Sequence, residues 1–325
     1  MRYVVTGGAG HVGSAVVASL LAREDTEGVV VADLRPARAL SDRVESEILD
    51  VRDVHRLTGV LERTRADAVL HLACSHDAAN GRQAMYETNV VGTNALLAAA
   101  VSAGTPHVLT ISSAACYAAG ADAEPLGEAA AFRTELESDL ARDRSTVDRL
   151  CQLWAARQPE RTMTIVRPCA VLTSAPEDAV ARLFTAPPHC AASGNPRAAV
   201  QFLHEDDFVA ALVLLATGGH GGIFNVAGGG TVELGDCVRL IGLKSSRGPL
   251  KKLRRGKGAR ELFEELELLV GTPPIATERL RQVGWTPHHA SRAAFEAAMG
   301  TRGKLVEPAR TPAAPVVPDV VGEPS

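Results

Sequence analysis

Near-continuous apolar runs alternate along the chain with longer amphipathic stretches. The apolar runs predict buried strands over 2–7, 28–33, 68–73, 107–113, 164–168 and 222–228. The amphipathic stretches predict helices near 11–23, 53–65, 81–103 and 137–157. Strands that are apolar on both faces, each followed by a helix, are typical of a parallel sheet covered by helices on both sides. The predicted fold class is therefore α/β, with a doubly wound parallel sheet.

Two segments depart from this pattern. After about Gly300 the chain becomes Pro-rich and non-periodic ("EPARTPAAPVVPDVVGEPS"), and we expect residues 300–325 to be disordered. The stretch 244–260 ("KSSRGPLKKLRRGKGAR") carries eight Lys or Arg residues in 17. It is either a solvated surface loop, a flap over the substrate, or a patch that attracts an anionic ligand.

Composition narrows the classes of function. A net charge of −4, and a basic run without interleaved aromatic residues, argue against nucleic acid as a partner. The sequence contains no run of about 18 apolar residues, so we expect no membrane span. The six cysteines form no CxxC pair and no metal-ligand cluster with histidine, so we expect no metal site and a reducing, cytoplasmic location. The opening "MRYVVTGG" leaves no room for a signal peptide.

The strongest chemical signal is the glycine-rich turn in "VVTGGAGHVGSAVV" (4–17). Gly7, Gly10 and Gly13 follow a predicted strand and open a predicted helix, which suits the pyrophosphate of a dinucleotide at the helix N-terminus. Asp33 ends the next strand, 20 residues beyond Gly13, where a carboxylate can hold the adenosine ribose. Asp33 favours NAD(H), whereas Arg35 and Arg38 can pair with the 2′-phosphate of NADP(H). The sequence therefore leaves both NAD(H) and NADP(H) as candidate cofactors.

Further motifs follow in a fixed order along the chain. They are "TGGAGHVG" (6–13), "LDVRD" (49–53), "HLAC" (71–74), "NVVGTNALLAAA" (89–100), "ISSAACY" (111–117), "VRPCAVL" (166–172), "QFLHEDDFVAAL" (201–212) and "LRQVGWTP" (280–287). From Arg2 to Met299 this set resembles the extended short-chain dehydrogenase/reductases, the NAD-dependent epimerase/dehydratase family. The resemblance implies a Rossmann fold that binds a nicotinamide dinucleotide.

The resemblance also implies roles for individual residues. Ser113 matches the catalytic serine, and Asn89 lies in the helix motif that hydrogen-bonds backbone near the active site. The positions implied to contact the cofactor are Gly7, Gly10, His11, Val12, Gly13, Asp33, Arg35, Asp50, Val51, Leu72, Ala73, Arg144 and Pro168.

One departure from the family is decisive for the chemistry. Where near relatives have a catalytic tyrosine and, four residues on, a lysine, this chain has Leu140 and Arg144. It contains only three tyrosines, and no lysine precedes Lys244, so no YxxxK motif exists anywhere in it. Leucine carries no proton, and a guanidinium with a pKa above about 12 is a poor acid. Losing a positioned acid typically costs about 10²- to 10⁴-fold in rate.

Several groups are candidates for the missing acid. His76 follows the "HLAC" motif and can reach a substrate, whereas Tyr117, His204 and Cys116 are better explained by structural roles. The substrate can instead carry its own acid, since a phenol beside a ketone can protonate the product oxygen. An apolar Leu140 suits a flat polycyclic ligand. The chain thereby resembles the atypical angucyclinone ketoreductases of antibiotic biosynthesis, like the simocyclinone enzyme, which lack the tyrosine.

We therefore predict an NAD(P)H-dependent ketoreductase for a cyclic, aromatic polyketide-type ketone. Residues 1–168 form the dinucleotide-binding core, 169–299 complete the sheet and form a small substrate-binding part, and 300–325 are the tail. The alternatives are a non-catalytic NAD(P)-binding sensor or scaffold, and a sugar-nucleotide epimerase or dehydratase. The partner is a small-molecule substrate, and the protein is a monomer or a homodimer.

Overall fold

The computed structural model describes residues 1–37, 41–75, 81–118, 124–133, 138–176, 178–186, 190–243 and 259–304. The predicted tail beyond residue 304, most of the basic run at 244–258, and His76 and Arg38 lie outside the described residues.

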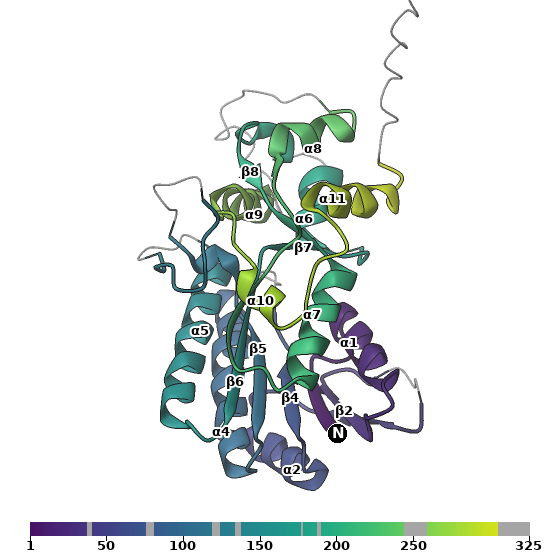
Figure 1. Cartoon of the computed structure of the whole chain (residues 1–325), viewed down its shortest axis with the longest axis vertical. Coiled ribbons are helices and arrows are strands. Elements are labelled where there is room, and N and C mark those ends of the chain that lie inside the picture. Colours follow the sequence, from purple (N-terminus) through teal and green to yellow (C-terminus); the bar gives the residue numbers. More distant parts are fainter. Residues whose placement is uncertain are drawn as a thin grey trace, which may run out of the picture.

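A seven-stranded sheet forms the centre of the molecule (Figure 1). Its strands are β1 (Arg2–Thr6), β2 (Gly28–Asp33), β3 (Val44–Ile48), β4 (Ala68–His71), β5 (His107–Ile111), β6 (Thr162–Pro168) and β10 (Gly222–Val226). They pair in parallel in the order β10-β6-β5-β4-β1-β2-β3. The strand order reverses between β1 and β4, and such a switch point is where doubly wound sheets bind ligands. The predicted fold class is confirmed.

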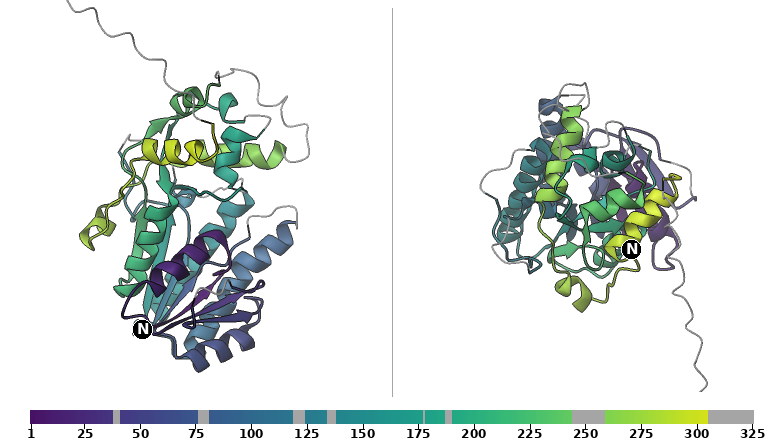
Figure 2. Two further views of the ribbon diagram at one scale, coloured as in Figure 1. Left: turned by 90° about the vertical axis from the view of Figure 1, so that its right-hand side faces the viewer. Right: turned by 90° about the horizontal axis from the view of Figure 1, so that it is seen from above.

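Helices cover both faces of this sheet. They are α1 (His11–Leu21), α2 (Val54–Thr64), α3 (Arg82–Tyr86), α4 (Gly92–Ser102), α5 (Asp139–Arg157), α7 (Glu205–Thr217) and α10 (Glu278–Gln282). Figure 2 shows α1 and α7 on one side of the sheet and α4 on the other. Tyr3 and Val5 of β1 pack into the core under α1 and α7, whereas Val4 packs into the core under α2 and α4. Because both strand faces are buried, the strand sequences are apolar without alternation.

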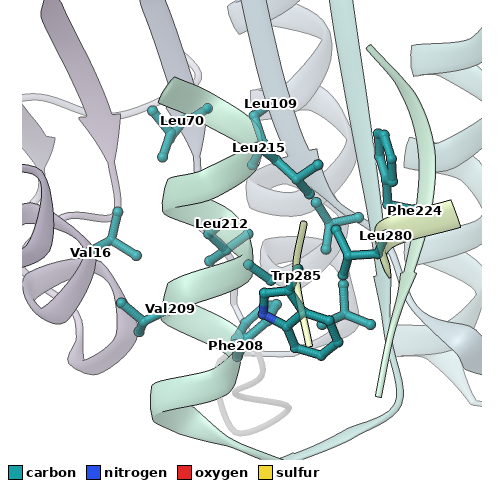
Figure 3. Packing of buried hydrophobic residues seen from close by; sticks show 14 of the residues in the cluster. Val16, Leu70, Leu109, Phe208, Val209, Leu212, Leu215, Phe224, Leu280 and Trp285 are labelled. Carbon is teal, nitrogen blue, oxygen red and sulfur yellow. The ribbon is translucent and has the colours of Figure 1, made fainter. Parts of the chain in front are cut away.

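The core between α1, α7 and the sheet is continuous (Figure 3). Val209 of α7 lies toward Val16 of α1, and Trp285 lies beside Phe208. The indole N–H of Trp285 donates to the carbonyl of Asp207 at 3.2 Å, which fixes the segment after α10 against α7.

A smaller C-terminal part lies at the carboxyl ends of the strands (Figure 1). It contains β7 (Ala170–Leu172), β8 (Ala199–Val200), β9 (Phe202–His204), β11 (Val232–Glu233), α6 (Ala179–Thr185), α8 (Leu234–Leu240), α9 (Ala259–Gly271) and α11 (Ser291–Gly300). It has its own apolar core, in which the rings of Phe184 and Phe295 meet edge to face with centroids 4.8 Å apart.

Two features differ from the sequence prediction. The edge strand β3 was not expected, because its sequence VESEI is polar and mostly exposed and so lacks the apolar run that marks its neighbours. The single helix expected over 81–103 is divided into α3, a π-helical turn over Glu87–Val91, and α4. None of the described helices is both long enough and apolar enough to cross a bilayer.

Candidate active site

The glycine turn connects β1 to α1 and leaves no room for side chains. Gly7 has φ +71°, and a Cβ there would lie 2.6 Å from the backbone nitrogen of Ala73. A Cβ on Gly13 would lie 2.1 Å from the carbonyl oxygen of Gly7. Gly10 caps α1 without a side-chain hydrogen bond, so N–H groups of the first turn stay open to a ligand. This turn fits the pyrophosphate of a dinucleotide, whose charge the helix N-terminus favours.

Asp33 ends β2 beside this turn. One carboxylate oxygen accepts from the backbone N–H of Ala9 at 3.1 Å, and the other accepts from the N–H of Arg35 at 3.1 Å. The Arg35 side chain is 72% exposed, and its Nε lies 3.9 Å from the carboxylate. The carboxylate is therefore held in place beside the glycine turn.

Asp50 and Val51, two of the predicted cofactor contacts, come just after β3. Asp50 pairs with Arg52, whose side-chain hydrogen bonds lower the pKa of that carboxyl. Val51 is buried, and its methyl group lies 2.7 Å from where a Cβ on Gly92 would be.

A cavity of about 490 Å³ opens at the carboxyl ends of β1, β4, β5 and β6. Its lining includes the predicted site residues Gly7, Gly10, His11, Val12, Gly13, Leu72, Ser113, Leu140, Arg144 and Pro168. Asp33, Arg35, Asp50, Val51, Ala73 and Asn89 do not line it. The cavity therefore joins the glycine turn to Ser113, Leu140 and Arg144, which the sequence analysis aligned with the family's serine, tyrosine and lysine.

Ser113 lies where β5 runs into a short 3₁₀ turn over Ala114–Cys116. Its hydroxyl oxygen accepts from the backbone N–H of Ala115 at 3.1 Å. Because that bond uses only a lone pair, the hydroxyl proton is still available to a ligand in the cavity.

Leu140 and Arg144 face the cavity from successive turns of α5. The Arg144 guanidinium donates from Nη1 to the carbonyl of Ile111 at 2.8 Å and from Nη2 to Sγ of Cys74 at 2.7 Å. These contacts, from the ends of β5 and β4, fix a permanent positive charge in the cavity wall.

Asn89 does not line the cavity itself but hydrogen-bonds residues next to the cavity wall. Its side chain accepts from the N–H of Ser75 at 2.8 Å and donates to the carbonyl of Ser75 at 3.1 Å. It also donates to the buried carboxylate of Asp143 at 3.1 Å, and burial raises the pKa of that carboxyl. Asn89 thus holds the loop after β4.

Tyr117 is not placed to act as the missing acid. Its hydroxyl donates to Asn225 at 2.7 Å and accepts from Nη1 of Arg167 at 2.7 Å. Arg167 in turn forms a buried, two-pronged ion pair with Asp148 at 2.8 and 2.9 Å. Tyr117 is fully buried, which raises the pKa of its phenol, and it does not line the cavity. The other two tyrosines, Tyr3 and Tyr86, do not line it either.

His204 and Cys116, which were also weighed as the missing acid, have structural roles as well. His204 caps α7 by accepting from the N–H of Asp206 at 3.2 Å, and its ring stacks on His289 with centroids 4.1 Å apart. Cys116 is buried, and burial raises the pKa of its thiol to about 11. His11 lines the cavity and pairs with Glu205 at the start of α7.

The cavity lining also includes Cys74, Asp178 and Glu265, which the sequence analysis did not assign to the site. Cys74 was visible as the last letter of "HLAC". Glu265 is on α9, and no motif marks that helix, so only the fold brings it to the cavity. Among the described residues, no group of three or more His, Cys, Asp and Glu side chains could hold a metal ion.

The comparisons agree with this geometry. The model of the NAD dependent epimerase/dehydratase family matches residues 3–227. An uncharacterised protein of Mycobacterium tuberculosis is 25% identical over 94% of this chain and 86% of its own length. The dTDP-glucose 4,6-dehydratase of Salmonella typhimurium is 40% identical over 108 residues, which cover 30% of each chain.

Solved structures share the whole fold. That of dTDP-glucose 4,6-dehydratase from Bacillus anthracis in complex with NAD has a TM-score of 0.71 at 15% identity, covering 94% of this chain and 97% of that one. Since the family model covers more than half of the sequence, the chain belongs to the NAD-dependent epimerase/dehydratase family, and its cofactor is a nicotinamide dinucleotide, NAD(H) or NADP(H).

Proposed function

We propose that the protein is an NAD(P)H-dependent ketoreductase acting on a cyclic or polycyclic aromatic ketone of the polyketide type. The observation that carries this is Leu140, which lines the cavity one turn before Arg144 where the family has its tyrosine. An apolar side chain there removes the base that would take a hydroxyl proton from a sugar, but it provides a surface for a flat aromatic ligand.

The residues that line the cavity have separate roles in the proposed reaction. A bound nicotinamide supplies the hydride. The Ser113 hydroxyl, whose oxygen is already held by the N–H of Ala115, donates to the carbonyl oxygen and stabilises the alkoxide that forms. Arg144 adds a fixed positive charge but does not supply the proton.

The proton comes from the substrate in this proposal. As hydride adds to the carbonyl carbon, the neighbouring phenol transfers its proton to the alkoxide oxygen, and the negative charge remains as a delocalised phenolate. Water then reprotonates the phenolate. His76, which lies outside the described residues, stays a predicted alternative acid.

Turnover of a matched substrate pair tests this function. The protein should oxidise NADH or NADPH when given a polycyclic ketone with an adjacent phenol, and methylation of that phenol should abolish the reaction. Ser113→Ala should lower kcat by about 10²-fold, whereas Leu140→Tyr should gain less than about threefold because the proton is already supplied. Equal turnover of the methyl ether would rule out the substrate as the acid.

The cofactor preference follows from Asp33. We propose NAD(H), because a carboxylate held against two backbone N–H groups would repel a 2′-phosphate. Fluorescence titration with NADH and NADPH measures this directly, and tighter binding of NADPH would contradict it.

A second candidate is a sugar-nucleotide epimerase or dehydratase. The similarity to the Salmonella typhimurium dehydratase favours it, although that match covers only 30% of this chain. Conversion of UDP-glucose or dTDP-glucose would establish it. Tight dinucleotide binding without turnover on any carbonyl compound would instead indicate the non-catalytic sensor or scaffold.

A further inference from the structure

A histidine and a glutamate connect the starts of two helices beside the glycine turn. His11 is the first residue of α1 and lines the cavity, and Glu205 is the first residue of α7. Nε2 of His11 is hydrogen-bonded to Oε2 of Glu205 and lies 3.3 Å from Oγ of Ser174, in the loop between β7 and α6. Because a carboxylate can only accept, Nε2 carries a hydrogen and donates it to Glu205.

Glu205 is a charged group with little access to water. Its side chain is only 18% exposed. Burial by itself would raise the pKa of this carboxyl, but the hydrogen bonds from His11 and Ser174 outweigh burial and lower the pKa. A negative charge therefore lies one imidazole away from the first turn of α1.

This is an unfavourable place for a negative charge. The first turn of α1 fits the pyrophosphate of the dinucleotide, which is itself an anion. Like charges separated by about 10 Å or less repel each other in dilute salt, where the Debye length is longer than this. The Glu205 carboxylate therefore opposes pyrophosphate binding unless another group compensates its charge.

The position of Glu205 has a structural reason at the other side of the cavity. Its Oε1 accepts from the backbone N–H of Ser174 at 2.9 Å. Thr173 and Ala175, on either side of Ser174, both line the cavity. The carboxylate thus fixes part of the cavity wall, and this places its charge close to the cofactor end.

We propose that His11 determines the affinity for the dinucleotide, because its imidazole compensates the Glu205 carboxylate and shields the bound pyrophosphate from it. Glu205 is a positioning residue that holds the Ser174 loop and acts on the cofactor only through its charge. The inference extends the assignment of the cofactor site and does not depend on which ketone is reduced.

Fluorescence titration of the full chain with NADH tests the role of His11. His11→Phe keeps an aromatic ring but cannot donate to Glu205, so the carboxylate is left uncompensated. We expect this variant to bind NADH about tenfold more weakly in about 10 mM salt, where the Debye length is about 30 Å. In about 1 M salt the Debye length is about 3 Å, and the loss should shrink to about twofold or less.

Removing the charge of Glu205 should reverse this loss. Glu205→Gln retains an oxygen that can accept from the N–H of Ser174, so the wall stays in place. This variant should bind NADH at least as tightly as the unmodified protein. The double variant His11→Phe with Glu205→Gln should return to within about twofold of the unmodified protein in dilute salt, because no carboxylate is left to compensate.

Two further variants serve as controls. Asp206→Asn removes a negative charge from the next residue of α7, whose side chain is 81% exposed, and it should change the NADH affinity by less than about twofold. Urea unfolding checks that each variant is folded. If His11→Phe does not fold, His11→Gln takes its place, and since its amide can still donate to Glu205 the expected loss is about threefold.

The alternative is that the pair is only a structural contact between α1 and α7. In that case Glu205→Gln weakens NADH binding, the double variant binds no better than His11→Phe, and the losses are equal in dilute and concentrated salt. Any of these results overturns the inference, as does an unchanged affinity in His11→Phe. Because the titration needs no carbonyl substrate, each outcome is independent of the proposed ketoreductase.

Discussion

At the scale of single residues, Leu140 and Tyr117 show why residue type alone does not assign a role. Tyr117 has the chemistry of a proton donor, yet its hydroxyl is used between Asn225 and Arg167 in the interior. Leu140 has no such chemistry and yet faces the ligand cavity. The environment of each side chain therefore decides what it can contribute to catalysis.

Tyr117→Phe tests this distinction. We expect the free energy of unfolding to fall by about 1–3 kcal/mol, because Asn225 and Arg167 each lose a buried hydrogen-bond partner. The kcat with a phenolic ketone should stay within about twofold, since Tyr117 does not line the cavity. Urea unfolding and steady-state kinetics measure the two quantities. A loss of kcat of about 100-fold at unchanged stability would instead make Tyr117 the acid.

At the scale of elements, the turn between β1 and α1 shows how local backbone geometry shapes the proposed cofactor site. Gly13, in the first turn of α1, lies so close to Gly7 that any Cβ on it would overlap the carbonyl oxygen of Gly7. The helix can approach the end of β1 only without a side chain there.

Gly13→Ala should therefore displace the start of α1 and weaken dinucleotide binding by at least about 100-fold, as measured by NADH fluorescence. Gly59→Ala is the matched control, because Gly59 lies inside α2 and a Cβ there would meet no atom within 4 Å. That control should raise the free energy of unfolding by about 0.5–1 kcal/mol and leave binding unchanged. Equal binding by both variants would refute the glycine turn as the dinucleotide site.

At the scale of the whole molecule, buried polar side chains connect the sheet to the helices that cover it by hydrogen bonds. His71 of β4 is hydrogen-bonded to Thr6 of β1 at 2.7 Å and to Thr93 of α4 at 3.0 Å. It is fully buried, and burial, with the nearby charge of Arg144, lowers the pKa of its imidazole to about 3.

This burial predicts acid sensitivity. Between pH 6.5 and about 3 the unfolded chain binds a proton at His71 that the folded protein does not, so stability falls as pH falls through this window. At pH 5, 1.5 units below the ordinary value of 6.5, the loss from this group is about 2 kcal/mol.

Urea unfolding at pH 7.5 and pH 5 measures this loss. His71→Gln does not titrate, so its stability should fall by about 2 kcal/mol less than that of the unmodified protein over the same interval. His55→Gln, on the exposed side of α2, should retain the full pH dependence. An unchanged pH dependence in His71→Gln would contradict the buried, neutral state of His71.

The sequence alone determined six of the seven strands of the sheet, the glycine turn and the absence of any YxxxK motif, because each of these can be identified from a local pattern. An apolar run indicates a strand that is buried on both faces, and the glycine spacing indicates a turn without room for Cβ atoms. The absence of a motif can be read directly from the sequence. Only the tertiary structure decided which side chains share the cavity, because residues as distant in sequence as Gly7 and Glu265 line it together only when the strand ends and the C-terminal helices come together.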